Sequence, residues 1–136
     1  MKKVSVCFLV AISVFFVCTA FLQDYDLAKS IERGKELYTA NCNDCHRSNG
    51  IDPQDQYPPL AKSDYLMKPV DSLVTIVLEG QTGEIMVNNK KYNDEMLAQD
   101  YLSDAEIADV LNYVRNSWAN KMPVITPPQV KALRKQ

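Results

Sequence analysis

The sequence predicts one small, predominantly helical domain. Residues 26–40 carry apolar side chains at intervals that place them on one side of a helix, with charged residues between them. Residues 103–118 open with a capping box and continue with apolar residues at helical spacing. A strand pattern is predicted only at residues 85–92, where it is short and weak. The domain is therefore expected to have helices near both ends and little sheet.

The N-terminus carries the pattern of an export signal. Two lysines precede residues 4–22, which form an almost unbroken apolar run. Ala20 is a small residue of the kind that precedes a cleavage site, so we expect residues 1–20 to be a signal peptide and residues 21–136 to form the domain. The run is also close to the length that spans a bilayer, which leaves open its retention as a membrane anchor. The protein is therefore expected to be exported and periplasmic, either soluble or anchored to the inner membrane.

The four cysteines divide between the signal and the domain. Cys7 and Cys18 lie in the apolar run, and the bulky residues before Cys18 argue against its lipidation. Only Cys42 and Cys45 remain for the domain, and both belong to one motif. No further cysteine is left to form a structural disulfide.

The charge of the domain argues against one class of partner. Without the two N-terminal lysines, 13 of the 15 basic residues remain beside 17 acidic ones, which gives a net charge of −4. An acidic protein is repelled by a phosphate backbone, so nucleic acid is not an expected partner.

The motif Cys42-Asn43-Asp44-Cys45-His46 predicts the chemistry. Two thiols separated by two residues can each form a thioether with one vinyl group of a haem, and the histidine that follows can bind the iron. His46 is the only histidine of the chain, so no other imidazole is available to a metal. The sequence thus predicts one covalent haem c, with its iron, held by Cys42, Cys45 and His46.

Three other interpretations of the motif fit less well. A structural zinc site needs four ligands, and no cysteine or histidine follows His46. A thioredoxin-like redox motif follows a strand, and none is predicted before Cys42. A disulfide or two buried thiols would leave the adjacent histidine unexplained.

The residues after the motif are expected to support the histidine. Residues 47–57 are polar and contain a glycine and a proline, so they form a loop. Pro58-Pro59-Leu60 is an extended stretch with free carbonyls, one of which is expected to orient His46. We therefore assign Pro59 to the haem site.

Two short helices are expected next. Ser63 can cap one over residues 64–68, and Asp71 or Ser72 can cap another that ends at Gly80.

Three further features are local. Gly34 interrupts the first long helix, which suggests that another helix crosses closely there. Asn88-Asn89 supply a tight turn for a hairpin between residues 85–87 and 90–92. Thr126, followed by two prolines, starts a short last helix.

Two methionines can supply the second axial ligand of the iron. Met96 lies in an irregular segment before the C-terminal helix, where its side chain is free to point inward. Met86 lies in the strand pattern, where filling the core is a sufficient role. We favour Met96, and Met86 is the alternative.

Taken together, these residues resemble a class I cytochrome c. The resemblance covers nearly all of the domain and rests on Gly34–Tyr38 before the motif, Pro58–Leu60, Ser63–Leu66, Val87-Asn88, Tyr92, Met96 and the run Leu102–Trp118. It is similar to the cytochrome c domains associated with bacterial dehydrogenases or fused to copper nitrite reductases. The resemblance implies an all-α fold wrapped around one haem, a short hairpin near the sixth-ligand loop, long helices that cross near Gly34 and Tyr113, and ligation by a histidine and a methionine.

Ligation of the iron on both sides predicts the function. It leaves no coordination position for a substrate, so the expected reaction is outer-sphere electron transfer. We therefore expect an electron carrier and not an enzyme, with a dehydrogenase, a reductase or an oxidase as redox partner. The alternative is a haem enzyme or gas-binding protein with an open or labile sixth site. The chain offers no second histidine to assist peroxide or nitrite chemistry, which argues against that alternative.

Overall fold

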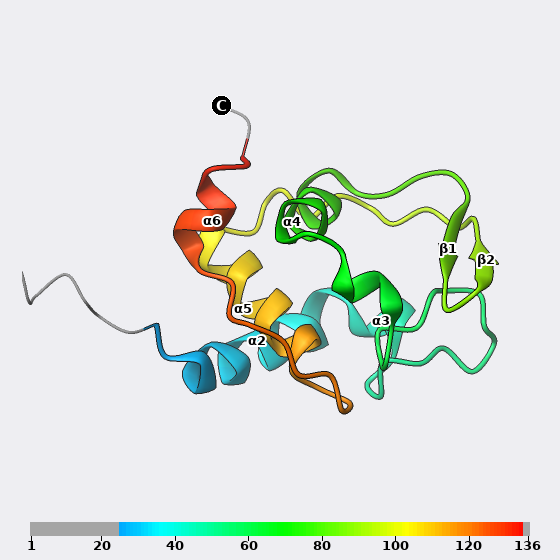
Figure 1. Ribbon diagram of the computed structural model, residues 1–136, viewed down its shortest axis with the longest axis horizontal. Helices are drawn as coiled ribbons and strands as arrows, with labels where there is room; N and C mark the ends of the chain where they lie inside the picture. The colour runs from blue at the N-terminus through cyan, green and yellow to red at the C-terminus, as the bar shows by residue number, and fades with distance from the viewer. Residues whose placement is uncertain (1–24, 135–136) are drawn as a thin grey trace, which may run out of the picture.

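The computed structural model describes residues 25–134, so the predicted signal peptide, residues 1–20, lies outside the described residues. The elements, shown in Figure 1, are α2 (Leu27–Asn41), α3 (Asn43–His46), the 3-10 turn η1 (Asp64–Met67), α4 (Val70–Glu79), the strands β1 (Ile85–Val87) and β2 (Lys90–Tyr92), α5 (Asp104–Arg115) and α6 (Pro127–Lys131). The predicted helical domain with one hairpin is confirmed. None of the helices within residues 25–134 is long and apolar enough to cross a membrane.

Helices α2 and α5 cross at Gly34. A Cβ added to Gly34 would lie 2.0 Å from the carbonyl oxygen of Asp109 and 2.9 Å from the Cβ of Tyr113. A residue without a Cβ is required where two backbones approach this closely. The expected crossing near Gly34 and Tyr113 is therefore confirmed, and Figure 1 shows the two helices overlapping near the middle of the domain.

Side chains cap three helices, and the caps at Ser103 and Thr126 are those predicted, whereas the cap at Asp26 was not predicted. The side chain of Asp26 accepts a hydrogen bond from the backbone N–H of Lys29 at the start of α2. Ser103 and Glu106 form the capping box of α5, and Thr126 takes part in another at the start of α6. A cap of this kind contributes about 1 kcal/mol, so the sequence sets these starting points locally.

The caps predicted for η1 and α4, the two short helices that follow the proline-rich stretch, are wrong. Ser63 precedes η1, but its side chain makes no capping hydrogen bond. Helix α4 begins at Val70, ahead of Asp71 and Ser72, because the carbonyl of the extended residue Pro69 accepts the first helical hydrogen bonds, from the N–H groups of Ser72 and Leu73. The end of α4 at Gly80 is as predicted, and its φ of 78° favours glycine.

The hairpin is tied to η1. Asn88 and Asn89 have φ of 48° and 62°, as a type I′ turn requires, and Ile85 pairs with Tyr92 in the expected register. Asp64 and Asn88 each accept a hydrogen bond from the other's backbone N–H, at 2.8 and 3.0 Å. These contacts fix the hairpin against the segment that follows the motif.

The core consists of two apolar clusters, and Leu37 packs against both. The larger cluster joins α4, α5 and α6, through residues that include Leu73, Val74, Ile107, Leu111 and Val130. The smaller cluster is formed by Tyr38, Leu66, Val110 and Val114, and Cys42 and Leu60 pack against it. The first cysteine of the motif therefore contacts the core.

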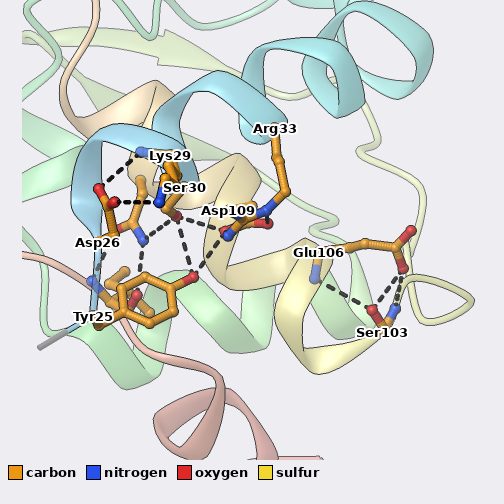
Figure 2. A network of polar contacts seen from close by, with 10 residues as sticks. Tyr25, Asp26, Lys29, Ser30, Arg33, Ser103, Glu106 and Asp109 are labelled. Carbon is orange, nitrogen blue, oxygen red and sulfur yellow. Dashed lines mark hydrogen bonds and ion pairs between the residues drawn. The ribbon is translucent and has the colours of Figure 1, made fainter. Parts of the chain in front are cut away.

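A buried carboxylate joins α2 to α5 beside their crossing, as Figure 2 shows. Asp109 is 3% exposed and accepts hydrogen bonds from Tyr25 (2.8 Å), from Ser30 (2.6 Å) and from Nε of Arg33 (2.6 Å). Burial alone would raise the pKa of Asp109, but the hydrogen bonds from Arg33, Ser30 and Tyr25 outweigh it and hold the pKa below its ordinary value of 3.8. Asp109 thus stays ionised between the two helices.

Replacing Asp109 with asparagine removes the buried charge that Arg33, Ser30 and Tyr25 stabilise, and it is expected to lower the free energy of unfolding by about 2 kcal/mol at pH 7. The loss is not larger because Arg33 is half-exposed, so solvent screens part of the ion pair. The pKa of Asp109 is lower in the folded than in the unfolded state. Its contribution is therefore complete well above pH 3.8 and is lost as the pH falls through the lower, folded-state value. Denaturant unfolding of both proteins from pH 7 to pH 3 should show the difference closing at the acid end.

A constant difference across this range would contradict a role for the Asp109 charge. Asp100→Asn serves as the control, because Asp100 is an exposed carboxylate in the loop before α5. Its replacement should change the free energy of unfolding by less than about 0.5 kcal/mol.

Candidate haem site

The two thiols and the imidazole of the motif lie within one turn of helix. Cys42 ends α2 and precedes α3, and the N–H of His46 donates to the carbonyl of Cys42 at 3.0 Å. Cys42 is partly buried and Cys45 is exposed, and both are free thiols. Burial, with a smaller effect of Cys45, raises the pKa of the Cys42 thiol to about 11. The turn thus presents two unpaired thiols beside one imidazole.

The carbonyl of Pro58 orients His46. Its oxygen lies 3.2 Å from Nδ1 of His46. Because a carbonyl only accepts, Nδ1 carries the proton and Nε2 presents a lone pair. Burial lowers the pKa of His46, against smaller opposing effects of Pro58 and Asp52, and this favours the neutral imidazole that binds a metal. Of the stretch from Pro58 to Leu60, Pro58 makes this contact, and the assignment of Pro59 to the haem site stays a prediction.

Two aromatic residues hold the loop directly behind His46. The hydroxyl of Tyr38 donates to the carbonyl of Arg47 at 2.6 Å, and Nε1 of Trp118 donates to the carbonyl of Ser48 at 3.1 Å. The rings of Tyr38, Tyr113 and Trp118 contact one another with centroids 5.2 to 5.4 Å apart. The helical pattern of the sequence indicated only an apolar role for Tyr38 and Trp118. A buried tyrosine hydroxyl or tryptophan N–H usually needs a hydrogen-bond partner. This requirement was the signal in the sequence that could have indicated their contacts with the loop.

Trp118 also corrects the predicted end of the C-terminal helix. Helix α5 ends at Arg115, and Trp118 follows in a turn with φ of 52°. Its ring covers Gly50, where an added Cβ would lie 2.7 Å from the indole. A turn, and not the helical repeat, therefore places the indole over the loop.

The methionines differ in exposure. Met96 is partly buried against the larger apolar cluster, and its backbone N–H and carbonyl both pair with Gln81 at 2.9 Å. Met86 is 51% exposed and Met67 is 78% exposed. The expectation that Met86 fills the core is wrong, because successive residues of a strand alternate and β1 buries Val87 instead. Of the two candidate ligands, only Met96 packs against the core.

The donor set fits a covalently attached haem. The thiols of Cys42 and Cys45 can form thioethers, Nε2 of His46 is a nitrogen ligand, and Met96 supplies a thioether sulfur. Ser63 is 4% exposed, and its hydroxyl has no hydrogen-bond partner within the part of the chain that the structure describes. A bound group with a polar edge, such as the carboxylates of a haem, can supply a partner for a buried hydroxyl.

Comparison with known proteins identifies related sequences. The sequence model described as cytochrome c matches residues 31–118. Over 124 residues the chain is 36% identical to cytochrome c-552 of Thermus thermophilus, with 85% of this chain and 83% of that protein covered.

Two longer proteins are also similar. The chain is 30% identical over 105 residues to the cytochrome c subunit of a quinone alcohol dehydrogenase from Gluconobacter oxydans, with 74% of this chain but 22% of that subunit covered. It is 32% identical over 127 residues to the gluconate 2-dehydrogenase cytochrome c subunit of Pantoea cypripedii, with 86% and 29% covered. The chain therefore corresponds to one part of each of these subunits.

Proposed function

The chain belongs to the cytochrome c family and carries one covalently bound haem c, and on this basis we propose that it is an electron carrier with histidine and methionine ligation. In this proposal Cys42 and Cys45 would form the thioethers, and His46 and Met96 would be the two protein ligands of the iron. The observation that carries it is the hydrogen bond from His46 Nδ1 to Pro58, which leaves Nε2 free beside two unpaired thiols.

Each of these residues has a distinct task. The thioethers of Cys42 and Cys45 keep the cofactor beside the α2–α3 junction. The Pro58 carbonyl fixes the ring of His46 and increases the basicity of its Nε2. Met96 is a soft, neutral ligand that favours reduced iron. The haem supplies an iron that gains and loses one electron, and ligands on both sides restrict the chemistry to electron transfer.

The second candidate, a haem enzyme or gas-binding protein, requires that Met96 does not bind the iron. The partly buried position of Met96 against the core supports the carrier. Carbon monoxide added to the reduced wild-type protein should therefore leave its visible spectrum unchanged. A spectral change would favour the second candidate.

We also propose that the partner is a dehydrogenase, a reductase or an oxidase outside the cytoplasm. Two relatives are cytochrome c subunits of dehydrogenases, which supports a partner of this kind. Residues 1–20 are proposed to direct export to the periplasm, followed either by cleavage or by retention as an anchor in the inner membrane. N-terminal sequencing of the purified protein distinguishes a start near Phe21 from a retained segment.

Acid-acetone extraction tests the covalent attachment. The haem is expected to stay with the wild-type protein, because thioethers survive this solvent. Cys42→Ala should leave one thioether and shift the α-band of the reduced spectrum, and replacement of both cysteines should release all the haem. The apoprotein should be largely unfolded by circular dichroism, because a domain of this size depends on its cofactor as part of the core.

Asn43→Ala is the matched control, since it changes a residue between the two cysteines without removing a thiol. It should retain haem like the wild type. Haem recovered in the solvent from the wild-type protein would rule out the thioethers.

A further inference from the structure

A single buried carboxylate closes the loop between His46 and Pro58. The side chain of Asp52 is 1% exposed. Its Oδ1 accepts a hydrogen bond from Nε of Arg47 at 3.3 Å, and its Oδ2 accepts one from the backbone N–H of Tyr57 at 3.3 Å. Arg47 directly follows His46, and Tyr57 directly precedes Pro58. Asp52 thus connects the two ends of the segment that forms the hydrogen bond from His46 to Pro58.

We propose that Asp52 is a positioning residue that holds the Pro58 carbonyl against His46 and, as a buried negative charge, lowers the reduction potential of the haem. The inference rests on the proposed function, in which His46 binds the iron.

The contacts show which side of the hydrogen bond depends on Asp52. The Arg47 side has two further anchors, because the Tyr38 hydroxyl donates to the Arg47 carbonyl and Nη1 of Arg47 donates to the Asp44 carbonyl, both at 2.6 Å. On the other side, the Asp52 carboxylate accepts the backbone N–H of Gln56 at 3.0 Å as well as that of Tyr57. Beyond Pro58 the chain is next fixed at Leu60, whose N–H donates to the Gly50 carbonyl at 2.9 Å. Loss of Asp52 is therefore expected to loosen the turn before Pro58 more than the helix that presents His46.

The charge acts in a defined direction. Burial alone would raise the pKa of Asp52, but the N–H groups of the turn and the side chain of Arg47 outweigh it, so the carboxylate is ionised. Reduction adds one electron from the redox partner to the iron that His46 would bind, and the negative charge of Asp52, in the loop that holds His46, opposes this reduction. Arg47, which is 40% exposed, offsets the charge only in part because solvent screens it.

Three variants of the holoprotein separate position from charge. Asp52→Asn keeps the size and an acceptor oxygen but removes the charge, and it should raise the midpoint potential in a spectroelectrochemical titration. Asp52→Glu keeps the charge and should return the potential towards the wild-type value. Asp52→Ala removes both, and exchange of the His46 Nδ1 proton, followed by NMR, should become about tenfold faster as the Pro58 carbonyl loosens.

Asp55→Asn is the matched control. Asp55 lies in the same loop, carries the same charge and is 55% exposed, and it pairs with Lys90 and Tyr92 of the hairpin. Its replacement loosens the loop, but water screens its charge, so the potential should move less than in Asp52→Asn.

The proposal is overturned if Asp52→Asn shifts the potential no more than Asp55→Asn does, or if Asp52→Glu behaves like Asp52→Asn. Failure of the proposed function is detected separately, in the wild-type protein. If its ferric spectrum lacks the signature of histidine and methionine ligation, the assignment of His46 and Met96 fails before any Asp52 variant is compared.

Discussion

Replacing Met96 with alanine is expected to open the sixth coordination position of the iron and to convert the carrier into a ligand-binding protein. The oxidised variant should lose the weak sulfur-to-iron band at the red end of the visible spectrum, and it should bind azide. The reduced variant should bind carbon monoxide. Loss of a soft ligand that favours reduced iron should lower the potential by a few tenths of a volt, within the range of roughly 0.8 V over which axial ligands set haem potentials.

The structure makes Met86→Ala a clean control for this experiment. Met86 is half-exposed, so its truncation should change the free energy of unfolding by less than about 1 kcal/mol and leave the spectrum intact. If Met86→Ala opened the iron and Met96→Ala did not, the two assignments would be reversed. If neither variant changed the spectrum or the binding of carbon monoxide, neither methionine would be the distal ligand. That result would favour the alternative of a haem enzyme or gas-binding protein.

Replacing Gly34 with alanine is expected to have the largest effect on stability. Alanine is favoured over glycine in a helix by about 1 kcal/mol. However, the added Cβ would lie 2.0 Å from the carbonyl oxygen of Asp109, so α2 and α5 must move apart. This separation would also strain the hydrogen bonds from Ser30 and Arg33 to Asp109. We expect a net loss of about 3 kcal/mol or more in denaturant unfolding, and a lower yield of holoprotein.

Gly83→Ala distinguishes this clash from a general effect of removing a glycine. A Cβ on Gly83 meets no atom within 4 Å, and its φ of 83° is the main obstacle to a side chain. The expected cost is therefore about 1 to 2 kcal/mol from backbone strain alone. Equal losses in the two variants would show that the close approach at Gly34 is not what limits stability.

Features whose causes lie within a few residues could be predicted from the amino-acid sequence. The motif from Cys42 to His46 needs only one turn of chain to bring its thiols and imidazole together. The capping box at Ser103 and the Asn88-Asn89 turn depend on local hydrogen bonds and on backbone φ, and both are formed as predicted. The glycine at position 34 likewise predicted a helix crossing from the local sequence. The residue expected to face it, Tyr113, was predicted only from the family resemblance.

Features whose partners are distant along the chain became visible only in the folded domain. The hydrogen bond from His46 to Pro58 spans 12 residues. The sequence alone does not distinguish among the carbonyls of the proline-rich stretch, because the conformation of the whole loop decides which one reaches the histidine. The alternation of β1 exposes Met86, but which side of the hairpin faces the core depends on its contacts with η1. Asp52 looked like an ordinary polar loop residue, because a carboxylate becomes a buried anchor only when the folded loop directs N–H groups and an arginine towards it.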